Sequence, residues 1–291
     1  MPSKPSLGTP LNVSGPLYSA VLEAFLIQEA SGTTAADSAA GGNDLTVDLA
    51  GAAWGSGPNG GAALEVNGGY EYPDTPPNRV YPGYSDPLPT IGAPITGAAD
   101  AEVTAPFSIV MLCKKYDQSP HSEAVNLSSE IIVKYGVTPD LNDLILRNTI
   151  DAALDTGFPT SIQFAQFASG GQMVVLWNVD LVDDEWHLLI LTTDGSLTLD
   201  ETKLYVDGAL QTADEDFSND GAGSPEVNTS DTLKPFGAND PTGFVTPAWG
   251  LIDTLQIFNT ALTSGNVASL QADPYLIWRE PVVGTLHNTF E

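Results

Sequence analysis

The sequence has few of the residues from which several functional classes are built. Its 291 residues include one cysteine, three histidines and nine lysines and arginines, against 37 aspartates and glutamates. One cysteine excludes an intrachain disulfide, and a formal net charge of −28 leaves no basic surface for nucleic acid. The same charge disfavours binding to anionic membranes. The sequence therefore points away from disulfide scaffolds, nucleic-acid binding and membrane-surface binding.

Long apolar runs and a secretory leader are also missing. No apolar run approaches the roughly 18 residues that suggest a membrane span. The first residues lack the charged and apolar regions of a signal peptide. Cys113 lies in the apolar run Phe107–Cys113, where we expect a buried and inert thiol rather than a nucleophile. We expect no membrane insertion, and a protein that is assembled in a cytoplasm.

The abundant residues favour β structure. The chain has 28 glycines and 22 prolines, which favour short strands and elaborate loops over helices. A chain of this length can bury a large core without a metal or a disulfide. Its acidic side chains are scattered, which is typical of a solvated surface.

The stretch from Asp183 to Thr212 gives the clearest local prediction. Asp207-Gly208 separates two strand-like runs, and this pair favours a tight hairpin turn. Trp186 and His187 begin the first run, and we expect them to pack and orient the hairpin rather than to bind a ligand. Three antiparallel strands are predicted here: Trp186–Thr193, Thr202–Val206 and Ala209–Ala213. Others are predicted at Ala20–Gln28, Phe107–Lys115, Ser161–Phe167, Gln172–Asn178 and Leu233–Phe236.

Both ends of the chain extend past this predicted domain. Residues 1–17 contain four prolines, which predict an extended arm that lies on another surface. Residues 279–291 form a second arm, so residues 18–278 are predicted to form a single domain. Two long insertions, at about residues 70–105 and 117–160, interrupt it.

Three stretches in order carry a family resemblance. The first, Glu29–Gly69, contains Ser-Gly-Thr-Thr, Asp-Ser, Gly-Asn-Asp and a tryptophan, and the second is the Trp-His strand with Leu-Tyr-Val-Asp-Gly. The third, Trp249–Trp278, contains Gly-x-Ile-Asp, Ile-Phe-Asn, Ala-Leu-Thr and Asp-Pro-Tyr. Together they resemble the laminin-G-like jelly rolls of the concanavalin A-like lectin/glucanase superfamily. The third is similar to the end of such domains on tailed-bacteriophage particles.

The resemblance implies the fold. We expect an all-β, antiparallel two-sheet jelly-roll sandwich with long loop insertions and one short C-terminal helix. Thr263 is the predicted N-cap of that helix. The family often has an acid where Asn266 stands, so we expect no capping box.

The resemblance also implies a structural calcium site between the first loop and the closing Ile-Asp strand. Calcium prefers oxygen ligands from carboxylates, amides and backbone carbonyls. The implied ligands are Asp37, Asn43, Asp44 and Asp253. Each of these side chains can equally cap a turn.

A second candidate contact lies in the first insertion. It combines prolines with Tyr72, Tyr81 and Tyr84, which suggests a stiff loop with rings for a protein or sugar partner. The alternative is that these rings pin the loop to its own domain.

Catalysis is not expected. No histidine lies near a Gly-x-Ser-x-Gly turn or near the lone cysteine. The Glu-x-Asp-x-x-Glu run of the superfamily's glucanases is missing. The nearest carboxylates, Asp183, Asp184 and Glu185, precede Trp186 in an acidic turn where a solvated role suffices.

Two functions follow as expectations. The first is a non-enzymatic structural or decoration protein of a bacteriophage virion, on head or tail. Its jelly roll is displayed outward and its arms dock on capsid or tail proteins or on copies of itself, and it can aid adsorption to host glycans. The alternative is a carbohydrate-binding module or calcium-dependent lectin that is not tied to a virion.

Overall fold

The structure is a computed structural model of the chain. It describes residues 1–39, 44–47, 52–58, 60–66, 95–96, 106–116, 127–135, 142–150, 161–168, 171–181, 183–195, 201–216, 233–235 and 250–279. Most of both predicted insertions and residues 280–291 lie outside these ranges. Among the described residues, no helix has the length and apolar character needed to cross a membrane.

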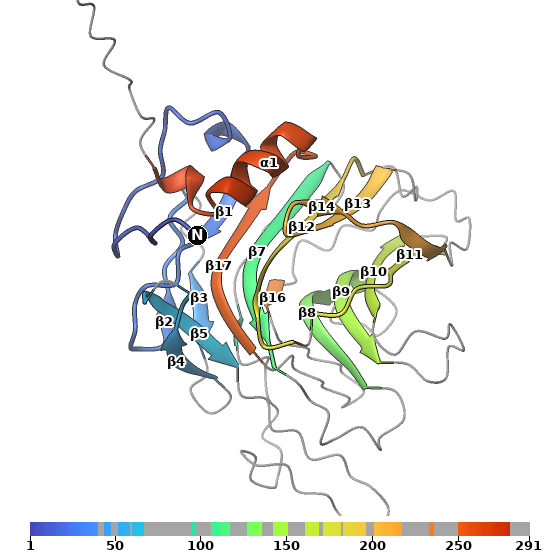
Figure 1. Ribbon diagram of the computed structural model, residues 1–291, viewed down its shortest axis with the longest axis horizontal. Coiled ribbons are helices and arrows are strands. Elements are labelled where there is room, and N and C mark those ends of the chain that lie inside the picture. The colour runs from blue at the N-terminus through green and yellow to red at the C-terminus, as the bar shows by residue number, and fades with distance from the viewer. Residues whose placement is uncertain are drawn as a thin grey trace, which may run out of the picture.

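The larger of two main sheets is antiparallel and eight-stranded, with the order β14-β13-β12-β7-β17-β5-β4 and with β1 also paired to β17 (Figure 1). The first strand of the chain therefore pairs with the last. The bounds are β1 Val21–Phe25, β4 Ala52–Ser56, β5 Ala62–Val66, β7 Phe107–Lys115, β12 Trp186–Thr193, β13 Thr202–Val206, β14 Ala209–Leu210 and β17 Gly250–Phe258.

The second main sheet has six strands in the order β15-β11-β10-β9-β8-β16, and a small sheet has the order β2-β3-β6. The six are β8 Leu127–Tyr135, β9 Asn142–Ile150, β10 Ser161–Ala168, β11 Gly171–Trp177, β15 Ala213–Asp216 and β16 Leu233–Pro235. The small sheet contains β2 Thr34–Ala35, β3 Leu45–Val47 and β6 Ile95–Thr96. The predicted all-β two-sheet sandwich is confirmed.

The main core lies between the two large sheets. Apolar side chains alternate along β7, and Phe107, Ile109 and Met111 pack toward the second sheet. Phe164 and Trp177 meet them from that sheet, with 6.4 Å between the ring centroids of Phe107 and Phe164. Cys113 is buried in this core, as predicted, and burial raises the pKa of its thiol to about 12. A thiol with this pKa stays protonated and inert at neutral pH.

A second core lies on the other face of the large sheet, under helix α1 (Ser264–Ala272). Figure 1 shows α1 beside β1 and β17, and its buried residues Val267 and Leu270 pack in this core. Thr263 is the N-cap, as predicted, but the expectation of no capping box is wrong. Asn266 accepts from the backbone N–H of Thr263, because its amide oxygen reaches back as a glutamate oxygen does.

The central hairpin matches its prediction in two strands of three. Both turn residues have positive φ, 51° at Asp207 and 78° at Gly208, as a tight hairpin turn requires. The third predicted strand, Ala209–Ala213, is split instead. β14 ends at Leu210, and β15 begins at Ala213 and pairs with β11 of the other sheet. The chain crosses between the sheets at this point, which ends the hairpin.

The N-terminal arm lies on its own sandwich. Two short 3-10 helices, η1 (Tyr18–Ala20) and η4 (Leu276–Trp278), follow the arm and α1, respectively. The backbone N–H of Asn12 donates to the carbonyl of Ile277 at 2.7 Å, and Leu11 and Leu17 are buried in the second core. The described arm therefore has an intramolecular docking site, where the sequence predicts a neighbouring surface.

We predict that Gly250→Ala destabilises the sandwich. A Cβ at this position would lie 2.1 Å from the carbonyl oxygen of Lys114 in β7. Relieving that overlap must separate the two central strands, so the free energy of unfolding should fall by about 2 kcal/mol or more in urea denaturation. Gly265→Ala is the matched control, because its Cβ would meet only Thr263 Oγ1 at 3.7 Å and alanine favours the helix. Equal stability of the two variants would contradict this packing.

Candidate functional site

A buried lysine at the start of the chain makes the most concentrated polar contact in the described structure. The Lys4 ammonium lies 2.9 Å from the carbonyl oxygen of Ile27, 2.7 Å from that of Ala62 and 2.8 Å from that of Asp253. It also lies 2.9 Å from Asp253 Oδ1, and the two side chains are 2% and 0% exposed. We call these four oxygens the oxygen cage.

The sheet explains why carbonyl oxygens converge there. β17 pairs with β5 over Gly250–Ile252 and with β1 over Leu255–Phe258, so its neighbour on one edge changes near Asp253. On the other edge the register with β7 also shifts between Ile252 and Thr254. Asp253 is therefore the extra residue of a bulge, and bulges leave ladder groups unpaired. Lys4 provides the hydrogen bonds that these carbonyl groups need in a buried place.

The charges of the pair depend on each other. Burial lowers the pKa of Lys4, and the Asp253 carboxylate opposes that shift. Burial raises the pKa of Asp253, and Lys4 and the Tyr275 hydroxyl oppose it. Tyr275 donates to Asp253 Oδ2 at 2.7 Å, so both carboxylate oxygens are engaged. Removing one partner of such a pair leaves an uncompensated buried charge, which is strongly destabilising.

The structure shows the surroundings of three of the four implied calcium ligands, Asp37, Asp44 and Asp253. The backbone N–H of Asp37 donates to Asp44 Oδ1 at 3.0 Å, so these two residues do lie together. Asp37 Oδ1 accepts from the backbone N–H groups of Ala24 and Ala39, which is a turn-capping role. Asp253 instead faces Lys4, whose ammonium occupies the place that a calcium ion would take at Oδ1. Asp253 thus has a partner that the implied calcium site did not include.

Asn43 lies outside the described residues. Within the part of the chain that the structure describes, no three His, Cys, Asp or Glu side chains are grouped so as to hold a metal ion. Calcium at Asp37, Asn43 and Asp44 stays a prediction.

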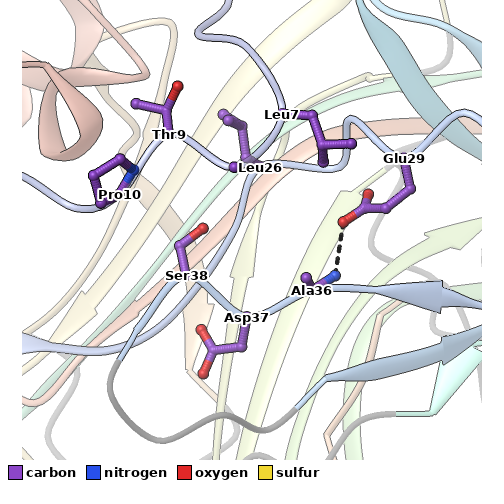
Figure 2. A pocket seen from close by; sticks show the side chains of 9 residues that line it. Leu7, Thr9, Pro10, Leu26, Glu29, Ala36, Asp37 and Ser38 are labelled. Carbon is purple, nitrogen blue, oxygen red and sulfur yellow. Dashed lines mark hydrogen bonds between the residues drawn. The ribbon is translucent and has the colours of Figure 1, made fainter.

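A pocket of about 270 Å³ lies between the arm and the first loop. In Figure 2, arm residues Leu7 to Pro10 form one wall, and Ala36 to Ser38 form another. The Glu29 carboxylate accepts from the backbone N–H groups of Ala36 and Gln28, at 2.8 and 2.9 Å. The Glu29 carboxylate therefore orders the loop that forms this wall of the pocket.

His187 forms a second polar cluster, next to the hairpin turn at Asp207-Gly208. Its Nδ1 lies 2.7 Å from Asp207 Oδ2, and its Nε2 lies 3.0 Å from Asp183 Oδ1. Asp207 Oδ1 also accepts from the backbone N–H of Leu188. His187 therefore ties the turn to the start of β12, which is the orienting role that the sequence predicts.

The ionisation of this cluster does not suit glycoside hydrolysis. Partial burial raises the pKa of Asp183, but hydrogen bonds from His187 and from the backbone N–H of Glu185 outweigh it, so its pKa is lowered. A general acid of a glycosidase needs a raised pKa. The lowered pKa of Asp183 is the opposite of that requirement.

Some predicted contacts cannot be placed, and one central residue was not predicted. Tyr72, Tyr81 and Tyr84 lie outside the described residues. Lys4 was missed, because proline spacing draws attention to the arm as a whole. The one feature of the sequence that could have pointed to Lys4 is that it is the only basic side chain of the arm, in a chain with nine lysines and arginines.

We predict that His187 makes the stability depend on pH. Burial lowers the pKa of His187, but hydrogen bonds to Asp207 and Asp183 outweigh this and raise it above its usual value. The stabilisation that protonated His187 contributes should be complete below the pKa of about 6.5 that a histidine has in the unfolded chain. It should be lost as pH rises through the higher pKa of His187 in the folded chain. Urea denaturation from pH 6 to pH 8 should give a falling free energy of unfolding, and His187→Asn should remove that component. An identical slope in the variant would contradict the assignment.

Comparisons with known proteins agree with this architecture. A family model described as the concanavalin A-like lectin/glucanases superfamily matches residues 129–268. The receptor binding domain of botulinum neurotoxin type G has a TM-score of 0.54 and 13% identity, over 87% of this chain and 51% of that one. The binding domain of botulinum neurotoxin DC, solved with rat synaptotagmin II, has a TM-score of 0.52 and 11% identity, over 88% and 52%.

An enzyme shares the fold as well. Trypanosoma rangeli sialidase has a TM-score of 0.51 and 14% identity, over 89% of this chain and 33% of that one. The chain thus spans about half the length of the two toxin domains and a third of the sialidase. No curated protein matches the sequence. At these identities the likeness concerns the fold alone, and that fold is the concanavalin A-like jelly roll.

Proposed function

We propose that the protein is a non-enzymatic binding protein that a bacteriophage particle displays on its head or tail surface. The jelly roll faces outward and binds host glycans, and the rest of the chain attaches it to capsid or tail proteins or to further copies. The observation that carries the binding role is the fold, which is shared with lectins and receptor-binding domains. Fold alone does not decide function, so chemistry must support the absence of catalysis.

The absence of catalysis is supported by the contacts of five of the described carboxylates. Glu29 and Asp37 accept backbone N–H groups, and Asp253 is paired with Lys4. Asp183 and Asp207 are held by His187. Most glycoside hydrolases use two carboxylates across a cleft with opposed pKa values, whereas each of these five already has a partner within the fold.

The attachment to a particle is supported by sequence and by the outer surface of the arm. The third stretch of the family resemblance, Trp249–Trp278, is similar to the end of jelly rolls on tailed-bacteriophage particles. Lys4 fixes the inner side of the arm, while Leu7 and Val13 are 59% and 70% exposed. Exposed apolar side chains of this kind suit contact with a neighbouring subunit.

The glycan-binding part is tested with the purified chain on a glycan array. We expect binding, and at least a tenfold loss of affinity for Tyr81→Ala or Tyr84→Ala, because a stacked ring contributes about 1–3 kcal/mol on the scale of other aromatic contacts. Leu210→Ala, at an exposed apolar residue of the central hairpin, is the matched control and should bind normally. Release of sugar from a bound glycan would contradict the non-enzymatic assignment, and absence of binding would contradict the glycan role.

The particle part is tested by mass spectrometry of purified particles. We expect the chain at a fixed ratio to capsid or tail proteins. A Leu7→Ser/Val13→Ser variant should fold normally, since neither side chain enters the core, but should be lost from particles. Lys203→Ser, at a 43% exposed side chain far along the sequence, should be incorporated normally. A chain that folds and binds glycans but is absent from particles would favour the alternative, a free carbohydrate-binding module.

A further inference from the structure

We propose that the ammonium group of Lys4 is a tethered cation that fills a preformed cation site. In this chain the N-terminal arm takes the place of the calcium ion that the family resemblance implies at Asp253. If the ammonium is removed, the oxygen cage should become a site for a free hard cation such as calcium. This inference does not depend on the proposed function, because it concerns only the closure of the sandwich.

The cage oxygens are positioned by elements other than the arm. Ile27 follows β1, Ala62 begins β5, and Asp253 lies within β17, and these three strands belong to one sheet. Ile27 has a φ of 53°, which is unusual for a β-branched residue and turns its carbonyl out of the strand ladder. The cage oxygens therefore come from the sheet and from the residue that follows β1, not from the arm.

The hairpin between β4 and β5 is shaped around the cage. A Cβ on Gly57 would lie 2.3 Å from Asp253 Oδ1, and one on Gly61 would lie 2.9 Å from Lys4 Cδ. Both glycines thus let the backbone approach the ion pair closely. Close approach of this kind excludes water and leaves the cage oxygens dependent on one bound cation.

The composition of the cage resembles a metal site more than an ordinary lysine contact. An ammonium has three hydrogens, whereas four oxygens lie within 2.9 Å of Nζ. At least one hydrogen must therefore be shared between two of these oxygens. Three carbonyl oxygens and one carboxylate oxygen are typical ligands of a hard cation, which binds them at about 2.3–2.6 Å when it is calcium. A small inward movement would bring the four oxygens to that distance, and in Lys4→Ala the space left by the side chain would admit the water molecules that complete the six to eight oxygens of calcium.

The cage also explains how the arm is held. Pro5 accepts from the side chain of Gln28, and Ser3 accepts from the side chain of Arg279. These contacts flank Lys4 on both sides, so the ammonium cannot enter the cage without placing the arm. Docking of the arm is therefore coupled to the pairing of the first and last strands.

The experiment compares the wild type with Lys4→Ala and Lys4→Met in EDTA and in saturating CaCl2. The wild type should gain no Tm from calcium at the cage, and any gain that it shows through Asp37, Asn43 and Asp44 is the baseline for both variants. Both variants should lose about 10 °C in EDTA, because a buried carboxylate loses its partner. Calcium should restore at least half of this loss in Lys4→Ala, where space for an ion is left. It should restore none in Lys4→Met, whose side chain fills that space.

Calcium titration gives a second readout that does not depend on Tm. Lys4→Ala should bind one calcium ion at the cage, and Lys4→Ala/Asp253→Asn should have lost that site. Lys203→Ala, which removes an exposed lysine, should match the wild type in both assays. If Lys4→Ala folds only when calcium is present, the proposal is supported as well.

Three results would overturn the proposal. One is a wild-type chain that binds calcium in a manner abolished by Asp253→Asn, since the cage would then hold a metal already. Another is a Lys4→Ala variant that gains neither stability nor a bound ion from calcium. The third is a Lys4→Ala variant as stable as the wild type in EDTA.

Discussion

The structure depends on the way the last strand shares one edge between two earlier strands. β17 pairs with β5 before Asp253 and with β1 after it, so the two ends of the jelly roll meet on a single strand. Such an arrangement leaves carbonyl groups unpaired in a buried place, and buried carbonyl groups need donors. Lys4 supplies them, and its charge is balanced by Asp253. The sandwich and the arm are therefore one cooperative unit.

One face of the large sheet is covered by other parts of the chain, and we call it the closed side. On the closed side, the arm, α1 and η4 cover one face of the large sheet with a continuous apolar core. His187 fixes the hairpin turn of the same sheet through Asp183 and Asp207. The charged side chains of these two clusters, at His187 and at Lys4, contact other residues of the same chain. Under the proposed function, a partner would be recognised by loops and by the outer surface of the arm, because binding residues are often on loops that a rigid scaffold positions.

The fold could be predicted from local chemistry, whereas the central ion pair could not. The hairpin at Asp207-Gly208 and the N-cap at Thr263 follow from residues next to one another, and both are confirmed. The split of Ala209–Ala213 depends on which sheet the chain joins next, and local propensity does not encode that. Lys4 and Asp253 are 249 residues apart, so their contact needs the complete strand order. The family resemblance singled out Asp253 as a calcium ligand, whereas the structure shows Lys4 as its partner.

A crystal structure of the wild-type protein, grown with calcium and measured for anomalous scattering, tests this account most directly. The account predicts the Lys4 ammonium within hydrogen-bond distance of the carbonyl oxygens of Ile27, Ala62 and Asp253, with no anomalous peak between them. A calcium peak beside Asp253, with Lys4 turned out into solvent, would contradict it.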